Sequence, residues 1–195
     1  TLAHAAARVM YEEDVKEYLR AKRIAARRIY GRGGQRVRPF DLPSNAEIRD
    51  ALRELAAMYE GEARATRLFA MRIVALETMS ALEAFTPRLI GSVGSGHVRR
   101  GSDIDLHVFC DAEDDLWSCL SGLGWACDVQ RVSIFNGGAP RDYVHVYLDD
   151  IFPIELTVHD RRALRERPRS SIDGRPIVRL SSAALRGLLR REHAD

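Results

Sequence analysis

The chain has 195 residues, of which 46% are hydrophobic and 30% charged, with 30 Lys and Arg against 28 Asp and Glu. This balance supports a buried core and argues against wholesale disorder or a fibrous repeat, and no apolar stretch is long enough to span a bilayer. Because residues 1–10 lack a charged-then-apolar leader, we expect a cytoplasmic protein. The three cysteines have neither zinc nor redox spacing, so we expect buried thiols and no disulfide scaffold: Cys110, Cys119 and Cys127.

The N-terminal third is expected to be helical. Apolar residues recur at spacings of three and four from Tyr11 to Ile29, which predicts one helix that ends near Gly31. Three glycines and two prolines over residues 31–43 then predict a loop.

A basic stretch overlaps this helix and loop. It contains eight cationic residues and no acidic one: Arg20, Lys22, Arg23, Arg27, Arg28, Arg32, Arg36 and Arg38. Such a run could bind the phosphates of a nucleic acid, with Tyr30 and Phe40 as nearby stacking surfaces. The alternative is a solvated helix face that continues into a loop. The sequence leaves both interpretations open.

A second helical segment follows. Ser44 and Glu47 have capping-box spacing, which predicts a helix start. Gly61 is expected to break or weaken the helix, and Pro87 to end it. We therefore expect an N-terminal helical region over residues 1–86.

The hydrophobic period changes in the second half. Strict alternation over residues 103–108 predicts a strand whose apolar and polar residues face opposite ways. Further segments are expected as a short apolar run at 88–92, a helix at 111–122, strands at 129–135 and 142–148 around a turn at 136–138, a strand at 152–158, and a helix at 182–191. This order predicts an α+β fold, with a core over residues 87–160 and a C-terminal extension over 161–195 that ends in a short helix.

One segment combines a glycine-rich turn with paired acids. Gly91 and Ser92 follow an apolar run, and a turn of small residues lets backbone N–H groups and a hydroxyl approach phosphate oxygens. Asp103 and Asp105 lie two residues apart on the expected strand, so both carboxylates point the same way and can bind hard divalent cations. Triphosphate and metal binding together are what a two-metal phosphoryl or nucleotidyl displacement requires.

The segment resembles the signature of the DNA polymerase beta-like nucleotidyltransferase superfamily, especially its minimal branch. The matching positions are Gly91, Ser92, Gly96, Ser102, Asp103, Asp105 and Leu106. The resemblance covers roughly residues 88–160. It implies a small mixed sheet backed by helices, an NTP substrate such as ATP, two Mg²⁺ or Mn²⁺ ions, and a third carboxylate on a later strand.

Glu155 is the candidate for the third carboxylate. It is the acid within the last expected strand, on the side away from Ile154 and Leu156. Its expected role is to bind the acceptor-side ion and help deprotonate the attacking hydroxyl. The alternative is a solvent-facing glutamate, with Asp149 and Asp150 as weaker candidates that fit a turn better.

The sequence departs from many relatives at Ser95, where they have Arg before the position of Gly96. Arg99 and Arg100 are candidates to supply that positive charge to the triphosphate, or they face solvent. With Gly91, Ser92 and Ser102 they complete the expected nucleotide-binding set. We assign no catalytic role to the expected-strand and loop histidines, which are His97, His107 and His159.

The sequence therefore predicts a metal-dependent nucleotidyltransferase that moves a nucleoside monophosphate from an NTP to an acceptor hydroxyl. The alternative is a non-catalytic module of the same fold, acting as an antitoxin-like or nucleic-acid-binding protein. The acceptor (small molecule, protein or RNA), the preferred base and the oligomeric state are left open.

Overall fold

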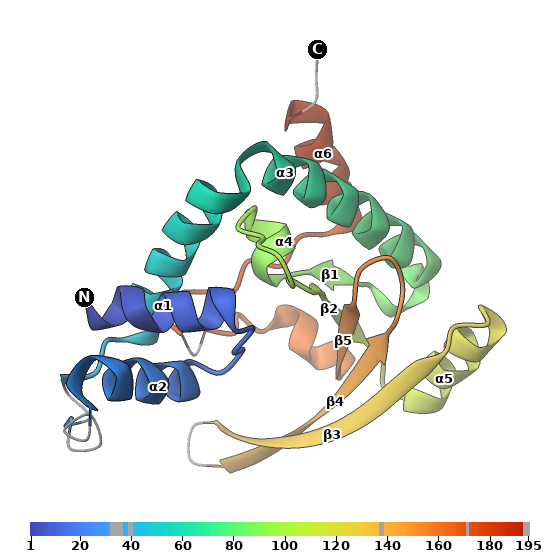
Figure 1. The fold of residues 1–195 in the computed structure, drawn as a ribbon. Helices are drawn as coiled ribbons and strands as arrows, with labels where there is room; N and C mark the ends of the chain where they lie inside the picture. The colour runs from blue at the N-terminus through green and yellow to red at the C-terminus, as the bar shows by residue number, and fades with distance from the viewer. Residues whose placement is uncertain (32–36, 39–40, 137–138, 171, 193–195) are drawn as a thin grey trace. The chain divides into compact units, whose positions relative to one another are not determined.

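The computed structural model describes all residues except 32–36, 39–40, 137–138, 171 and 193–195 (Figure 1). It divides into two compact units. The first unit comprises Thr1–Ala65, Val98–Gly101 and Arg169–Arg175, and the second comprises Thr66–His97, Ser102–Pro168 and Pro176–Asp195. The expected divisions after residues 86 and 160 stay predictions.

The first unit begins with two helices, α1 (Leu2–Glu12) and α2 (Tyr18–Tyr30). The expectation of one continuous helix from Tyr11 to Ile29 was wrong. The chain breaks at Asp14, whose φ of 52° is left-handed, in a run of three acids that oppose the negative C-terminal end of the α1 dipole. The end near Gly31 is confirmed, since α2 stops at Tyr30 and Gly31 has a φ of 56°.

The third helix, α3 (Asn45–Ala81), starts at the expected capping box. The Ser44 Oγ accepts a hydrogen bond from the Glu47 N–H at 3.1 Å, and the Glu47 carboxylate accepts one from the Ser44 N–H at 2.7 Å. Gly61 interrupts the helix with a φ of 45°, which confirms the expected break. The helix ends at Ala81, before Pro87, and a 3-10 turn, η3 (Glu83–Phe85), follows it.

The core of the first unit is built largely from alanine. Small side chains let α1 and α2 pack closely, and the start of α3 completes the cluster. Its buried members are Ala3, Ala6, Ala7, Val9, Met10, Val15, Ala21, Ala25, Ile48, Ala51 and Leu52.

The second unit contains a five-stranded sheet in the order β1-β2-β5-β4-β3. The strands are β1 (Arg88–Leu89), β2 (Ile104–Phe109), β3 (Cys127–Asn136), β4 (Ala139–Leu148) and β5 (Ile154–His159). β2 and β5 run parallel, whereas the other pairs are antiparallel. The sheet is therefore mixed, and the expected α+β fold with an N-terminal helical region is confirmed.

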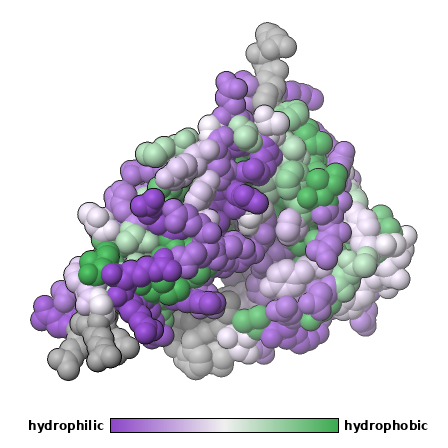
Figure 2. All heavy atoms as spheres, viewed as in Figure 1, coloured by the Kyte–Doolittle hydropathy of each residue, from purple (hydrophilic) through white to green (hydrophobic). Residues whose placement is uncertain are grey.

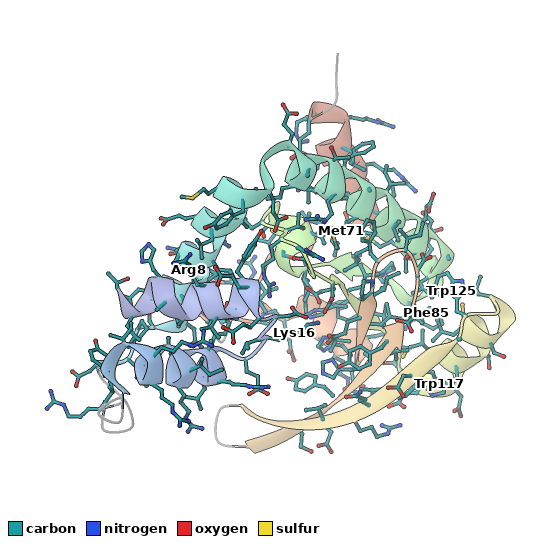
Figure 3. The ribbon with its side chains drawn as sticks, in the orientation of Figure 1. Arg8, Lys16, Met71, Phe85, Trp117 and Trp125 are labelled. Atoms are coloured by element: carbon teal, nitrogen blue, oxygen red, sulfur yellow. The ribbon has the colours of Figure 1, made fainter. Side chains whose placement is uncertain are left out.

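Helices in the second unit are α4 (Gly91–Ser95), α5 (Glu113–Gly122) and α6 (Ser182–Glu192), together with the part of α3 from Thr66 and the 3-10 turn η4 (Arg161–Arg165). Their buried side chains include Met71 and Met79 of α3, Leu116 of α5 and Leu185 of α6. Met71 points from α3 toward the sheet in Figure 3. These helices thus back the sheet, as expected.

Alternation gives the sheet two different faces. One is apolar, with Ile104 and Leu106 of β2 beside Ile154 and Leu156 of β5, all nearly inaccessible to solvent. The opposite face carries Asp105, Glu155 and the polar or aromatic residues that alternate with the core positions. The candidate site lies on this second face.

The expectation of buried thiols was right for one of the three cysteines and wrong for the other two. Only Cys110 is buried, whereas Cys119 is half-buried and Cys127 is exposed near the start of β3. No helix in the described ranges is both long and apolar enough to cross a membrane.

Candidate active site

The centre of the candidate site is a pair of carboxylates on adjacent parallel strands. In the register of β2 and β5, Asp105 lies directly beside Glu155. Residues that are level with each other on neighbouring strands project from the same face of a sheet. The two predicted carboxylates, 50 positions apart in sequence, thus become neighbours through strand pairing alone.

Gly91 lies against one of these carboxylates. A Cβ at this position would stand 2.2 Å from Oδ2 of Asp105, so the carboxylate occupies the space over the glycine Cα. Gly91 also has a φ of 67°, which L side chains rarely adopt. The Ile90 N–H, one residue earlier, donates to the Asp105 carbonyl at 3.0 Å. The glycine-rich turn and the acidic strand therefore meet at a position where only glycine fits.

A buried arginine, Arg72, binds the backbone of this glycine-rich turn. Arg72 of α3 is 2% exposed, and its Nε donates a hydrogen bond to the Val93 carbonyl of α4 at 3.1 Å. Its guanidinium also pairs with Glu192 of α6. Gly96 lies next to this guanidinium in left-handed conformation, with a φ of 79°, and a Cβ there would lie 3.4 Å from the Arg72 Nη2. Arg72 thereby ties α4 to two longer helices.

The second carboxylate has a histidine partner. Nδ1 of His145, on β4, lies 2.5 Å from Oε1 of Glu155 on β5. The side chains of His145 and Glu155 are 16% and 26% exposed, so both are half-buried. The His145 ring stacks on Tyr147 with centroids 6.4 Å apart and an interplanar angle of 17°.

Farther along the same face, two histidines and a phenylalanine pack beneath an arginine. His107 and His159 have ring centroids 4.3 Å apart, and the Arg179 guanidinium lies 5.1 Å from the Phe109 ring centroid. Nε of Arg179 donates to Nδ1 of His107 at 3.1 Å. Within the described structure, Nε2 of His159 is a buried polar atom without a hydrogen-bond partner.

Burial and positive charge keep both histidines neutral. Desolvation, followed by the nearby His159 and Arg179, lowers the pKa of His107 to about 3. Desolvation and then Arg179 lower the pKa of His159 to about 4. These rings are neutral packing and hydrogen-bonding groups at neutral pH.

The remaining predicted site residues are distributed over both units. Ser92, in α4, and Ser102 and Asp103, just before β2, belong with Asp105 and Glu155 to the second unit. Arg99 and Arg100 belong to the first unit. There the Arg99 guanidinium lies 4.0 Å from the Asp14 carboxylate, and the Arg100 N–H donates to Glu60 at 2.8 Å. Their contact with a triphosphate stays a prediction.

Carboxylate oxygens are the type of ligand that hard divalent cations prefer. Two of the predicted carboxylates are neighbours, because Asp105 adjoins Glu155. Within the residues that the structure places, no three acidic, histidine or cysteine side chains are arranged to hold a metal ion. The Glu155 carboxylate is turned to His145 instead. Binding a cation between Asp103, Asp105 and Glu155 would therefore require their side chains to reorient.

Sequence reasoning missed His145, Arg72 and Arg179. Alternation over residues 142–148 places His145 on the face of Tyr143 and Tyr147, but only the register of β4 with β5 brings it to Glu155. Arg72 lies on an otherwise apolar helix face, where a lone arginine gives no sign of its distant partners.

No protein-family model and no curated protein matches the chain. Some solved structures resemble part of it. A cytoplasmic RNA terminal U-transferase is 20% identical, with a TM-score of 0.34 over 49% of this chain and 30% of that one. Cid1 in complex with the UTP analogue UMPNPP is 15% identical, with a TM-score of 0.33 over 55% and 38%. The GLD-2/RNP-8 complex is 19% identical, with a TM-score of 0.31 over 58% and 48%. The chain thus spans less than half of each of these structures.

Proposed function

We propose that this chain is a nucleotidyltransferase that moves a nucleoside monophosphate from an NTP to an acceptor hydroxyl. The observation that carries the proposal is the pairing of Asp105 with Glu155 on adjacent parallel strands, with Gly91 packed against the Asp105 carboxylate. The sequence motif supports it independently, because Gly91, Ser92, Asp103 and Asp105 stand at the positions of the superfamily signature.

In this proposal the acceptor oxygen attacks the α-phosphorus, the bond from that phosphorus to the bridging oxygen breaks, and pyrophosphate leaves. Asp103 and Asp105 would hold two Mg²⁺ or Mn²⁺ ions, and Glu155 would complete the acceptor-side position. Such ions supply charge neutralisation on the triphosphate and at the attacking and leaving oxygens. Glu155 would also help take the proton of the acceptor hydroxyl.

The phosphates would lie against Gly91 and Ser92, where no side chain blocks the backbone and a hydroxyl is available. Ser102 would contribute a second hydroxyl, and Arg99 and Arg100 would add positive charge. This assignment leaves the acceptor undetermined among small molecules, proteins and RNA. It also leaves the base open, with ATP as the first nucleotide to test.

The test is transfer from α-labelled NTPs, with Asp105→Asn as the diagnostic variant. Removing one carboxylate charge should reduce transfer by about 100-fold or more, because each oriented charge at a transition state contributes several kcal/mol. Asp149→Asn and Asp150→Asn are matched controls, since both acids are exposed between β4 and β5 and should leave transfer near the wild-type rate. Undiminished transfer by the Asp105 variant would contradict the proposal.

A second candidate is a non-catalytic nucleic-acid-binding module. It is favoured by an exposed basic line on α2, formed by Arg20, Arg23 and Arg27 at spacings of three and four. Calorimetry separates the two candidates. No heat from any NTP with Mg²⁺ or Mn²⁺, together with salt-sensitive RNA binding, would favour the module.

A further inference from the structure

Arg72 is a buried cation to which the proposed reaction gives no role. It lies on α3 between two fully buried apolar residues, Met71 and Ala75, and is itself only 2% exposed. Removing an ion from water is costly, and replacing a buried ion pair by apolar side chains of similar volume is often neutral or stabilising. The packing of α3 alone therefore does not explain why an arginine stands at this position.

The guanidinium meets α4 at the end of that short helix. The helix stops one residue before Gly96, which is left-handed with a φ of 79°. The His97 N–H, which would bond to the Val93 carbonyl in a continuing helix, donates instead to the Ser92 carbonyl at 2.9 Å. Nε of Arg72 donates to the Val93 carbonyl at 3.1 Å. Arg72 thus caps the C-terminal end of α4 and places a positive charge at the negative end of the helix.

The other side of the same guanidinium is bonded to α6. Nη1 of Arg72 pairs with the carboxylate of Glu192, in the last turn of α6. Because the guanidinium is planar and rigid, bonds from Nε and Nη1 to two different elements fix its orientation. The Val93 carbonyl of α4 is therefore bonded to a side chain that is held by both α3 and α6.

We infer that Arg72 is a positioning residue for the turn that receives the phosphates of the NTP; this inference rests on the proposed function. In that function the phosphates lie against Gly91 and Ser92, the first two residues of α4. A helix of five residues is not stable alone, so its place depends on contacts from outside. Without Arg72 the turn would occupy its binding position for only part of the time, and the apparent affinity for NTP would fall by that fraction. Arg72 acts through the α4 backbone and does not touch the nucleotide.

A purely structural role for Arg72 makes a different prediction. A structural arginine would stabilise the second unit as a whole, so its loss would speed amide hydrogen exchange in the central strand β2 as much as in α4. A positioning arginine holds α4 locally, so its loss would speed exchange over residues 91–97 and leave β2 protected.

The experiment compares three variants of the full chain. Arg72→Met removes the donor and the charge but keeps an unbranched side chain of similar volume. Arg72→Lys keeps a positive charge and a donor without the planar fork. Thr78→Val is the matched control, because Thr78 is another buried polar residue of α3, and its hydroxyl donates to the Val74 carbonyl of the same helix at 2.9 Å rather than to α4.

Two quantities are measured for each variant beside urea unfolding, kcat and KM. Hydrogen–deuterium exchange, followed by mass spectrometry, compares residues 91–97 with β2. Calorimetry measures the binding of the α,β-methylene analogues of ATP, UTP, CTP and GTP, with and without Mg²⁺. The exchange readout reports on α4 whether or not a nucleotide binds.

We expect Arg72→Met to speed exchange over residues 91–97 by about 10-fold or more, because a hydrogen bond from a charged donor is lost, with β2 near wild type. The Kd for the analogue and the KM for NTP should rise by about 10-fold, with a smaller change in kcat. Arg72→Lys should show the same changes to a smaller extent, and it takes the place of the methionine variant if that variant does not fold. Thr78→Val should behave as wild type in each readout.

Three results for Arg72→Met would each overturn the inference: wild-type exchange over residues 91–97, equal acceleration in β2, or unchanged affinity for an analogue that the wild type binds. All three leave the proposed function standing. If exchange changes over residues 91–97 alone but the wild type binds no analogue, with or without Mg²⁺, the proposed function fails. Arg72 is then an anchor of α4 with no nucleotide for which the turn is positioned, and the inference falls for that separate reason.

Discussion

At the scale of single residues, Gly91 has the most restricted position in the candidate site. Its φ of 67° and the 2.2 Å separation between a would-be Cβ and Oδ2 of Asp105 both exclude a side chain. Gly91→Ala should therefore displace the Asp105 carboxylate. Because a shift of about 1 Å in a reacting group can cost about 100-fold, we expect a loss of that size in kcat/KM for nucleotidyl transfer.

Gly94→Ala is the control for this variant. It lies in the same short helix, α4, but an added Cβ would meet its nearest atom, the Leu89 carbonyl oxygen, at 3.6 Å, which is ordinary contact. Urea unfolding of both variants separates an effect on nucleotidyl transfer from the strain of an L residue at positive φ, which costs about 1 to 2 kcal/mol. Wild-type transfer by Gly91→Ala would mean that the Asp105 carboxylate is not needed where the structure places it.

The sequence could predict some of these residues and not others. Alternation places Asp105 and Glu155 on the polar sides of β2 and β5, because the period of a strand is a local property, whereas Asp103 lies just before β2. The neighbours His145 and Arg72 depend on strand register and on the packing of α3 against α4, and neither is encoded in a short window. The catalytic role of Glu155 itself stays a prediction.

At the scale of elements, residues with strong backbone preferences predicted the helix boundaries better than the continuity of an apolar pattern did. The capping box before α3 and the break at Gly61 each follow from one or two residues with strong backbone preferences. The apolar period from Tyr11 to Ile29, by contrast, continues through the break at Asp14, because α2 resumes with Tyr18 and Ala25 directed to the core that also buries Val15. Two helices that bury their apolar residues in the same core can therefore show the apolar period of one continuous helix.

The basic line on α2 is the element whose function is most directly testable. Within the described structure, Arg28 pairs with Glu13, whereas Arg20, Arg23 and Arg27 have no ion-pair partner and are exposed. Hydrophilic residues cover much of α1 and α2 on the face shown in Figure 2. Replacing Arg20, Arg23 and Arg27 with Gln should weaken binding to single-stranded RNA and lower the slope of log K against log salt by about 2, at about 0.7 for each phosphate contact.

The matched control replaces three ion-paired arginines outside the basic stretch with Gln, namely Arg8, Arg53 and Arg131, which pair with Glu12, Asp50 and Glu113. Both triple variants lose three positive charges, so a difference between them reports position rather than net charge. Fluorescence anisotropy with a labelled oligouridine over a range of salt concentrations measures both. Equal slopes for the two variants would show that α2 is an ordinary solvated helix face.

At the scale of the whole molecule, charge is unequally divided. The first unit has 17 basic and 11 acidic residues, whereas the second has 13 and 17. The structure contains the expected helical first third and strand-rich second half. Both could be predicted because the spacing of apolar residues differs between helices and strands. Contributions of residues 98–101 and 169–175 to the first unit were not expected, because segments distant in sequence join a unit through tertiary contacts.

Acid stability is also a property of the whole molecule, and it depends on the histidines of the second unit. Burial lowers the pKa of His107 from its ordinary value of 6.5 to about 3, so between these values the unfolded chain binds the proton and the folded chain does not. Stability must therefore fall as pH decreases below about 6.5. From pH 7 to pH 5, His107 alone should cost about 2 kcal/mol, and His159, whose folded pKa of about 4 also lies below this window, should add a loss of similar size.

Urea unfolding at pH 7, 6 and 5 measures this loss. Three acids with lowered pKa values should contribute little to the loss between pH 7 and pH 5. The pKa of Asp173 is lowered to about 2 by its hydrogen bond with Arg49, and the pKa values of Glu13 and Glu47 are also lowered. His107→Asn keeps an acceptor for Nε of Arg179 but cannot take up a proton, so its loss of stability from pH 7 to pH 5 should be reduced to the part that His159 contributes. A wild-type protein as stable at pH 5 as at pH 7 would mean that His107 is not held neutral beneath Arg179, and the packing of this face would need a different explanation.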